Sequence, residues 1–365
     1  MVVSGYYGFG NAGDELILGV LCHALAGHRV TVLSADPART AREFGVAAVR
    51  RFDIAAIWRT LAQTDLLVSG GGGLLQDATG PASVPYYLGV IGMARARGCR
   101  VMIYAQGIGP IRKRWARAGL SLLRGAAAAT VRDPESREML LRAGVRDVEV
   151  TADAALCLPR PARAGGLPPE LRALGIEAGT PVVALAPRPY GPPGFAARLA
   201  AGIGQSVAQT GARVLLVPMQ RQEDTGACLD LHARLGAAAM LLPSDVPPQR
   251  YPEVFAACDA VLGMRLHALI LAALGRVPAV GLSYDPKIRA FAQGLVPDIA
   301  DLPLDSPADA IAAAVVQRLA PDAERTARLD RQVGDLQRLA SRNNEILKDL
   351  LAAVPQPTSA RRPSS

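Results

Sequence analysis

The chain has 365 residues, half of them hydrophobic, which is enough for two ordinary domains with separate cores. It carries 40 basic and 32 acidic residues, a formal net charge of +8. The basic residues are scattered along the chain with few aromatic residues between them, which argues against a nucleic-acid partner and leaves anionic substrates or an anionic membrane face open. Only three basic residues are lysines, at positions 113, 287 and 348.

The five cysteines lie in apolar or Ala-rich surroundings without metal-ligand or CxxC spacing, which is typical of buried thiols in a reducing compartment. The sequence starts with the strand-like MVVSGYYGFG and shows no signal-peptide pattern. No uninterrupted apolar run approaches the roughly 20 residues that span a bilayer. We therefore expect a cytoplasmic protein that can associate peripherally with the inner face of the membrane.

Short apolar, β-rich segments alternate with longer helical patterns in the first part of the chain. These segments are residues 1–5, 29–35, 66–73, 100–107 and 127–133. The alternation predicts βαβ units, and hence a Rossmann-like N-terminal domain over residues 1–160. The Pro-, Gly- and Arg-rich segment 158–175 then interrupts the pattern and is typical of a domain linker.

A second series of strand segments follows the linker. These are residues 181–189, 213–220, 238–244, 258–265 and 277–285. They predict a C-terminal Rossmann-like domain over residues 175–305, so the expected fold class is α/β with two doubly wound domains. A helical pattern covers residues 306–352, and the composition of residues 353–365 predicts a disordered tail.

Two glycine-rich loops follow strands of the N-terminal domain. GYYGFGNAGDE (5–15) leads into a helix that we expect to open at Asp14, and its glycines suit either a tight turn or a crevice of exposed N–H groups. SGGGGLLQD (69–77) has more glycines than a turn requires, which indicates close approach of a ligand. The candidate binding residues here are Gly8, Asn11, Gly71, Gly72 and Gly73.

Three arginines stand where predicted strands end. Arg132 precedes an Asp-Pro pair that already explains the helix start, Arg188 follows ALAP, and Arg265 follows DAVLG. Lys287 lies nearby in sequence in GLSYDPKIRAF, close to Tyr284. Ligands collect beyond the carboxyl ends of strands in such sheets, and arginine forks match carboxylate and phosphate. Together these residues predict a site for a doubly charged anion.

His267 heads an otherwise apolar helical segment, GMRLHALILAALG (263–275). Apolar residues all round a helix indicate that it is buried, so an imidazole there has one of two explanations. It satisfies a structural hydrogen bond at the helix start, or it does chemistry beside the anion site, and the segment alone does not decide between them.

The motifs GYYGFGNAGDE, SGGGGLLQD, AQGIGP, TVRDPES and GMRLHALILAALGRVPAVGLSYDPKIRAF, in this order, resemble the polysaccharide pyruvyl transferase family over about residues 1–350. The similarity is greatest to the bacterial cell-wall enzymes that prepare S-layer anchoring polymers. This resemblance implies a GT-B-like fold with the active site in the cleft between two domains. It also implies phosphoenolpyruvate as co-substrate, no cofactor, and transfer of pyruvate as a cyclic ketal onto a sugar diol. The acceptor would be the 4- and 6-hydroxyls of an N-acetylmannosamine in a lipid-linked precursor.

The chemistry of that reaction fits the candidate residues. A proton must reach the methylene carbon of phosphoenolpyruvate, and His267 is the expected general acid. Arg265, Arg132, Lys287 and, less strongly, Arg188 would hold the carboxylate and phosphate, with Leu266 and Tyr284 beside them. Asp14 is the candidate base for the acceptor hydroxyl, although helix capping explains it equally well. No cluster of carboxylates or histidines has metal-ligand spacing, so we expect no metal.

Two other functions remain compatible with these residues. A GT-B nucleotide-sugar glycosyltransferase or epimerase would share the fold but usually has a glutamate for the ribose, and none lies between Gly263 and Gln293. A non-catalytic binder of anionic cell-wall polymer would use the same arginines but would not need His267.

Overall fold

The computed structural model describes residues 1–77, 82–162 and 166–353. The chain divides into two compact units. The first comprises Met1–Gly8, Ile17–Ala154 and the chain from Leu339 onward, and the second comprises Phe9–Leu16 and Ala155–Arg338. Residues 9–15 of the first glycine loop therefore belong to the second unit, whereas the sequence had placed the whole loop within an N-terminal domain of residues 1–160.

The first unit is built on a parallel sheet. Its strands are β1 (Val2–Tyr7), β2 (Thr31–Ser34), β3 (Ala47–Arg50), β4 (Leu66–Ser69), β5 (Arg100–Gln106), β6 (Ala128–Val131) and β7 (Val148–Val150). Their order is β3-β2-β1-β4-β5-β6-β7, and every neighbouring pair is parallel. The strand order reverses between β1 and β4, and this switch point is where ligands bind in open α/β sheets.

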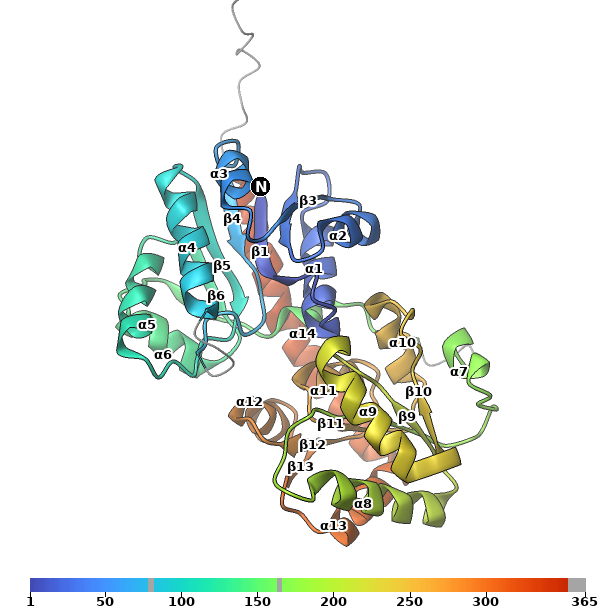
Figure 1. Ribbon diagram of the computed structural model, residues 1–365. Helices are drawn as coiled ribbons and strands as arrows, with labels where there is room; N and C mark the ends of the chain where they lie inside the picture. Colours follow the sequence, from blue (N-terminus) through green and yellow to red (C-terminus); the bar gives the residue numbers. More distant parts are fainter. Residues whose placement is uncertain (78–81, 163–165, 354–365) are drawn as a thin grey trace, which may run out of the picture. The chain divides into compact units, whose positions relative to one another are not determined.

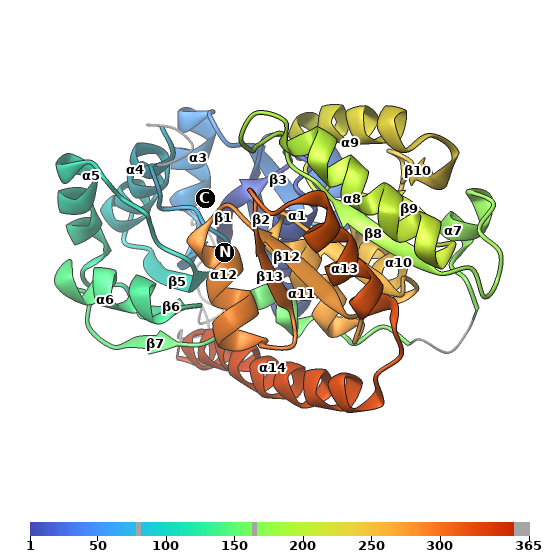
Figure 2. The ribbon, with the colours of Figure 1, turned by 90° about the horizontal axis from the view of Figure 1, so that it is seen from below.

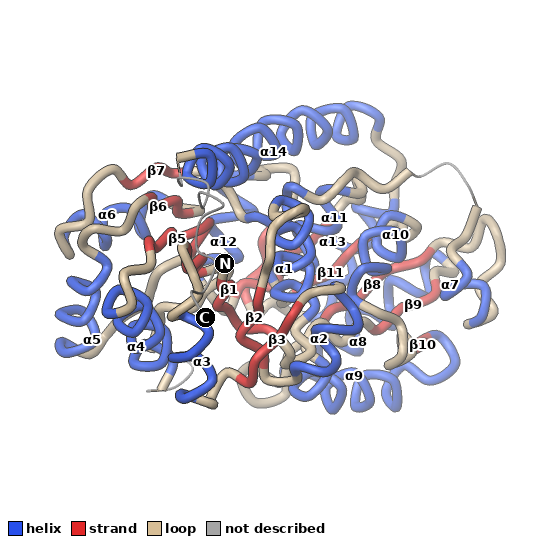
Figure 3. Tube along the Cα trace, turned by 90° about the horizontal axis from the view of Figure 1, so that it is seen from above, coloured by secondary structure: helices blue, strands red, loops and turns tan. Residues whose placement is uncertain are grey.

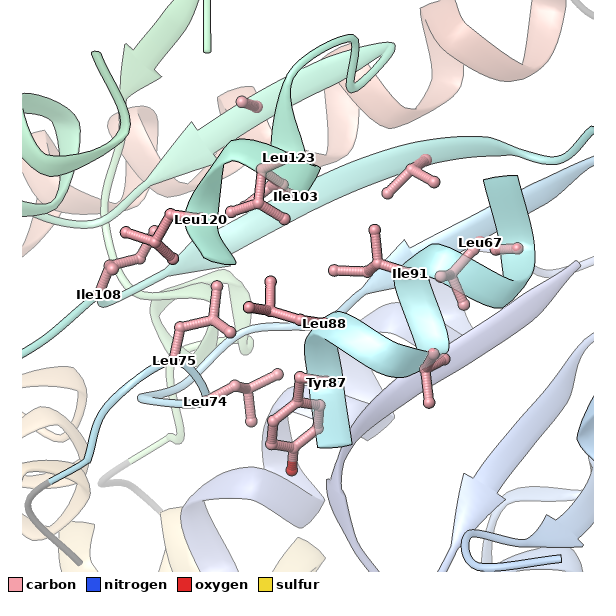
Figure 4. Packing of buried hydrophobic residues seen from close by; sticks show 14 of the residues in the cluster. Leu67, Leu74, Leu75, Tyr87, Leu88, Ile91, Ile103, Ile108, Leu120 and Leu123 are labelled. Carbon is pink, nitrogen blue, oxygen red and sulfur yellow. The ribbon is translucent and has the colours of Figure 1, made fainter. Parts of the chain in front are cut away.

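Helices cover both faces of this sheet (Figure 1). They are α1 (Ala12–Ala24), α2 (Pro37–Phe44), α3 (Ile54–Leu61), α4 (Ser83–Ala96), α5 (Arg114–Gly119), the 3₁₀ helix η1 (Leu120–Leu123), α6 (Pro134–Arg142) and the end of α14 (Ala323–Ala352). Asp36, Asp53 and Asp133 start α2, α3 and α6 by accepting a backbone N–H of the first turn. Side chains from α4 and η1 meet those of β4 and β5 in an apolar core (Figure 4).

The second unit repeats this plan. Its strands are β8 (Val182–Ala186), β9 (Arg213–Leu216), β10 (Ala239–Leu241), β11 (Ala260–Gly263), β12 (Ala279–Ser283) and β13 (Ala300–Pro303). They form a parallel sheet of order β10-β9-β8-β11-β12-β13, with the switch point between β8 and β11.

The helices of the second unit alternate with these strands. They are η2 (Ala154–Cys157), α7 (Pro169–Ala173), α8 (Phe195–Thr210), α9 (Arg221–Leu235), η3 (Gly236–Ala238), η4 (Pro248–Arg250), α10 (Tyr251–Ala256), α11 (Leu266–Leu274), α12 (Pro286–Arg289), the π-helical η5 (Ala290–Leu295) and α13 (Ala308–Leu319). Helices α8 and α13 cover one face of the sheet, with α10 and α11 on the other (Figures 1 and 2). Residues 268–274 of α11 are all buried, as their apolar sequence predicts.

The α/β class with two parallel, Rossmann-like sheets is confirmed, and several details differ from the sequence-based expectation. Helix α1 begins at Ala12 and not at Asp14, the region 306–352 forms the two helices α13 and α14, and the linker segment contains α7. Strands β3, β7 and β13 (Figure 3) were not predicted. They are short, and most of their residues are half-buried or exposed, so their sequences lack a continuous apolar run. The predicted tail lies, from residue 354, outside the described residues.

Candidate functional site

Polar side chains converge beyond the carboxyl ends of the second sheet, around its switch point. The turn after β8 carries Arg188, the turn after β11 carries Arg265 and His267, and the turn after β12 carries Tyr284. A fourth contribution comes from the first turn of α9, the helix after β9, which brings Glu223 and its neighbour Asp224. Parallel strands end at the same edge of a sheet, so residues far apart in sequence become neighbours here.

Arg265 is held in a fixed orientation by two carboxylates. Its Nε donates to Asp224 Oδ2 at 3.1 Å, and its Nη2 donates to Asp224 Oδ1 at 2.6 Å and to Glu223 Oε2 at 2.9 Å. Asp224 is fully buried. Burial lowers the pKa of Arg265, but the hydrogen bonds and negative charge of its acidic neighbours Asp224 and Glu223 together leave that pKa raised. Among the described residues, none accepts a hydrogen bond from Nη1, so this face of the guanidinium can meet a ligand.

Arg188 lies on the other side of Glu223. Its Nη2 is 3.7 Å from Glu223 Oε2, and its Nη1 donates to the phenol oxygen of Tyr284. The guanidinium carbon also lies 5.2 Å from the centroid of the Tyr284 ring, and Tyr190 packs against the same ring with centroids 5.0 Å apart. Burial raises the pKa of Tyr284 despite the opposing effect of Arg188, so the phenol is protonated at neutral pH. Glu223 thus links the two arginines that the sequence predicted for one anion site.

The glycine loop after β1 joins this network through Asn11. The Nδ2 of Asn11 donates to Gln220 Oε1 at 3.3 Å, and Gln220 Nε2 donates to Glu223 Oε1 at 2.9 Å. The backbone of the same loop is fixed by the N–H of Ala12, which donates to Met219 O at 2.7 Å. Residues 9–16 therefore belong to the second unit by direct contact with the turn that leads into α9.

Asn11 also caps helix α1. Its Oδ1 accepts the N–H of Gly13 at 3.1 Å and that of Asp14 at 3.4 Å, which satisfies the first free donors of the helix. The expectation that Asp14 lies at the cap is therefore wrong, because Asn11 already fills that position. Asp14 lies in the first helical turn, where its side chain is 7% exposed. Its part in chemistry stays a prediction.

His267 packs directly against the start of α1. A β-carbon on Gly13 would lie 1.9 Å from His267 Nδ1 and 2.2 Å from its Cγ, so only glycine leaves room for the imidazole. His267 is the second residue of α11, and its Nε2 is buried. The imidazole thus lies at the N-terminal turns of two helices, where both helix dipoles favour an anion.

Leu266 and Lys287 complete the predicted set in the second unit. Leu266 is the first residue of α11 and is partly buried. Lys287 is in the short helix α12, whose start is fixed by Asp285 Oδ1 accepting the Lys287 N–H at 2.9 Å. The structure therefore brings Asn11, Arg188, Arg265 and His267 into one unit.

The remaining predicted residues gather at the switch point of the first sheet. Gly72 pairs with Gln106 in an isolated parallel bridge, and Gln106 Nε2 donates to Ser69 Oγ at 2.7 Å and to Gly70 O at 3.1 Å. This fully buried glutamine fixes the loop of Gly71, Gly72 and Gly73. Gly8, the first residue after β1, has φ of +79°, a conformation that favours glycine.

Arg132 lies at the end of β6 in the same unit. Its Nη1 is 2.6 Å from Asp153 Oδ2, and both side chains are buried. A β-carbon on Gly107 would lie 2.5 Å from Arg132 Nε, so glycine in the AQGIGP motif leaves room for the guanidinium. Arg132 and the four-glycine loop thus belong to the first unit, while Arg188, Arg265 and His267 belong to the second.

Sequence reasoning missed Gln220, Glu223 and Asp224 in the second unit, and Gln106 and Asp153 in the first. The first three occur in the polar run QRQED directly after the predicted strand RVLLVPMQ, which is the same signal that identified the arginines. Asp77, the last residue of the segment SGGGGLLQD, has a structural role. Its carboxylate accepts the N–H groups of Arg112 and Lys113 at 2.9 and 2.8 Å, and these bonds lower its pKa.

Three further properties concern metal binding, disulfides and membrane-spanning helices. In the described ranges, no three His, Cys, Asp or Glu side chains are grouped so that they could hold a metal ion. The five cysteines form no disulfide. Among the helices described, none combines the length and apolarity needed to cross a bilayer.

Comparison with known proteins gives one family and one fold. The family model for polysaccharide pyruvyl transferases matches residues 11–286. No curated protein matches the chain. Solved structures with a similar fold include a glycosyltransferase from Rickettsia africae, with TM-score 0.63, 10% identity, and 96% of each chain covered.

Two further structures share the same fold. A putative UDP-N-acetylglucosamine 2-epimerase from Listeria monocytogenes has a TM-score of 0.69 and 12% identity, with 96% of each chain covered. HepE from Anabaena, solved with UDP and glucose, has a TM-score of 0.61 and 14% identity, covering 97% of this chain and 99% of its own. At these identities the likeness establishes the GT-B type of architecture, and the site must be interpreted from its own residues.

Proposed function

The chain belongs to the polysaccharide pyruvyl transferase family, and we propose that it transfers pyruvate from phosphoenolpyruvate onto a sugar diol as a cyclic ketal. The acceptor we propose is an N-acetylmannosamine, through its 4- and 6-hydroxyls, in a lipid-linked precursor of a cell-wall polymer of the S-layer anchoring kind. Family membership supports the pyruvyl transfer. The observation that supports phosphoenolpyruvate as the donor is that Arg188, Arg265 and His267 lie at one switch point.

The reaction needs one proton donor and a means to stabilise phosphate as it leaves. The first hydroxyl adds to the carbon that bears phosphate while the methylene carbon takes up a proton and becomes a methyl group. The carbon–oxygen bond to phosphate then breaks, and the second hydroxyl closes the ketal. The two hydroxyl protons balance the one gained by the methyl group and the one that leaves with phosphate.

The second unit has groups suited to the donor. Arg265 presents Nη1 while Asp224 and Glu223 hold the rest of its guanidinium, so the arginine is oriented before the ligand arrives. Arg188 shares Glu223 with it, and two guanidinium groups suit a ligand with both a carboxylate and a phosphate. Lys287 adds a point charge from α12 in this proposal.

His267 is the proposed general acid. Imidazole can deliver a proton near neutral pH, and the position of this ring against Gly13 fixes it at two helix N-termini that attract the anionic donor. Asp14, in the first turn of α1, is the proposed base or orienting acceptor for the sugar hydroxyl. We assign acceptor binding to the four-glycine loop of the first unit, and Arg132 stays a proposed ligand of the donor's carboxylate or phosphate.

A nucleotide-sugar transferase or epimerase is the second candidate, because the solved structures with this fold include HepE in complex with UDP and glucose and a putative UDP-N-acetylglucosamine 2-epimerase. A diphosphate would also be attracted to two arginines and two helix N-termini. Against it, the segment from Gly263 to Gln293 has no glutamate to bind a ribose. A non-catalytic polymer binder would leave His267 without a function beyond packing.

One assay separates the three functions. The purified chain is incubated with phosphoenolpyruvate and a mannosamine-containing disaccharide, then separately with UDP-N-acetylglucosamine and the same acceptor, and both phosphate and product mass are measured. The proposal predicts phosphate release and a pyruvylated acceptor only in the first reaction. In heavy water the new methyl group should contain deuterium. Turnover of the UDP-sugar alone would establish the second candidate, and no turnover with binding of anionic polymer would establish the third.

A further inference from the structure

Basic residues occur throughout the chain, but the net positive charge arises from one sequence segment. Residues 78–132 contain nine basic residues and no aspartate or glutamate. Since the whole chain has a net charge of +8, the residues outside this segment have a net charge of −1. The basic residues are Arg95, Arg97, Arg100, Arg112, Lys113, Arg114, Arg117, Arg124 and Arg132. The surplus therefore comes from one stretch of the sequence, which belongs to the first unit.

Five of these nine residues lie in or beside α5 and η1, which follow one another without a break. Ala116, Leu120 and Leu123 form the buried side of this helical segment, and Leu120 and Leu123 point into the core beside Leu88 (Figure 4). Since the spacing is about one and two helical turns, these three share one face.

Two large apolar residues lie exposed on a flank of the same segment, next to its buried face. Trp115 is 50% exposed and Leu122 is 45% exposed, and they stand seven residues apart, so they project from nearly the same face. Helix α5 lies at the outer margin of the first unit in three views (Figures 1, 2 and 3). The segment is therefore amphipathic, but its outward face carries a tryptophan and a leucine among cations.

The fold holds this segment in place without neutralising it. Asp77 accepts the backbone N–H groups of Arg112 and Lys113, Arg95 Nη1 donates to Leu122 O at 2.7 Å, and Arg124 Nε donates to Ala143 O at 2.7 Å. In the part of the chain that the structure describes, the ion pairs do not include Arg112, Lys113, Arg114, Arg117 or Arg124. Three consecutive cations also stand at the start of α5, with no acidic residue in its first turn, where a helix favours negative charge.

We propose that Arg112, Lys113, Arg114, Trp115 and Leu122, here called the α5 patch, dock the enzyme on an anionic phospholipid bilayer. Lysine and arginine are attracted to the negative surface of such a bilayer, and tryptophan and leucine enter the interfacial layer. The patch is small, so it supports reversible contact and not insertion. This inference goes beyond the proposed reaction and does not depend on it, because binding to vesicles is measured without substrate.

The test is flotation of the full chain with vesicles of phosphatidylcholine, with and without phosphatidylglycerol. The chain should float only with the anionic vesicles, and added salt should release it. The triple variant Arg112→Gln, Lys113→Gln, Arg114→Gln should lower the partition coefficient at least about tenfold. The matched control, Arg29→Gln, Arg42→Gln, Arg59→Gln, removes the same charge from exposed positions elsewhere in the unit and should change it less than about twofold.

A tryptophan reporter tests the apolar half of the patch. The chain has two tryptophans, so Trp58→Phe leaves Trp115 as the sole emitter, and its fluorescence should shift to the blue with anionic vesicles. Equal flotation of the triple variant and the matched control would overturn the proposal. So would tight binding to a soluble polyanion such as heparin without a Trp115 shift on vesicles, which would identify an anionic polymer as the partner.

Discussion

The imidazole of His267 and the backbone of Gly13 are in such close contact that a β-carbon on Gly13 would lie 1.9 Å from His267 Nδ1. Residue 13 belongs to α1 and residue 267 to α11, so this contact joins the first glycine loop to the anion site. The glycine is required for space and not for a special φ angle, since Gly13 is not among the glycines with positive φ.

Gly13→Ala should therefore disable His267 without unfolding the protein. The methyl group must displace the ring, because no smaller adjustment opens a 1.9 Å contact, and we expect turnover to fall about 100-fold or more if His267 is the acid. Gly19→Ala, in the same helix, is the control, since its β-carbon would meet only Phe44 at 3.7 Å. Steady-state phosphate release, with circular dichroism to confirm folding, checks this. Equal turnover of the two variants would contradict the assignment.

The Arg265–Asp224 pair makes a prediction for stability. Asp224→Ala leaves a largely buried guanidinium without its main partner, and loss of one member of a buried ion pair costs about 3–5 kcal/mol in free energy of unfolding. Glu223→Gln should cost less than about 1 kcal/mol, because Glu223 is 43% exposed. Urea denaturation of both variants gives the two values. A small cost for Asp224→Ala would show that the pair does not orient Arg265.

Lys287 should contribute to donor binding. Lys287→Met removes a positive charge that we propose binds the phosphate of the donor. We expect the drop in kcat/KM for phosphoenolpyruvate to correspond to a loss of about 1.5–3 kcal/mol in transition-state stabilisation. Lys348→Met is the matched control, since Lys348 is exposed near the end of α14. Unchanged kinetics in Lys287→Met would remove this lysine from the site.

Donor binding should need neither nucleotide nor divalent metal. The anion is expected to be held by guanidinium groups and helix N-termini, which require no ion to bridge them. Calorimetric titration with phosphoenolpyruvate in excess chelator should give the same affinity as without chelator. Binding that disappears with chelator and returns with magnesium would contradict this part of the account.

Much of the fold could be predicted because each inner strand is a continuous apolar run followed by a helical pattern. The same logic found Arg132, Arg188 and Arg265, since a charged residue directly after an apolar strand marks the carboxyl edge of a sheet. The edge strands β3 and β13 were not predicted, because they are short and partly exposed and their sequences lack a continuous apolar run.

Contacts between residues that lie far apart in the sequence could not be predicted. Asp224 and Arg265 are 41 residues apart, and Asn11 and Gln220 are 209 residues apart, so only the folded chain shows that they touch. The membership of residues 9–16 in the second unit depends on such contacts too. A glycine that makes room for an imidazole is likewise invisible in a single sequence, where it resembles the glycine of a turn.

The most direct test of the central claim is turnover of His267→Asn with phosphoenolpyruvate and a mannosamine-containing acceptor. Asparagine keeps a hydrogen-bonding side chain but cannot supply a proton. We predict that kcat falls by about 10²- to 10⁴-fold, the usual contribution of a general acid, while the affinity for phosphoenolpyruvate changes far less. A folded His267→Asn variant that binds the donor and turns over at near the wild-type rate would contradict the claim that His267 protonates the methylene carbon.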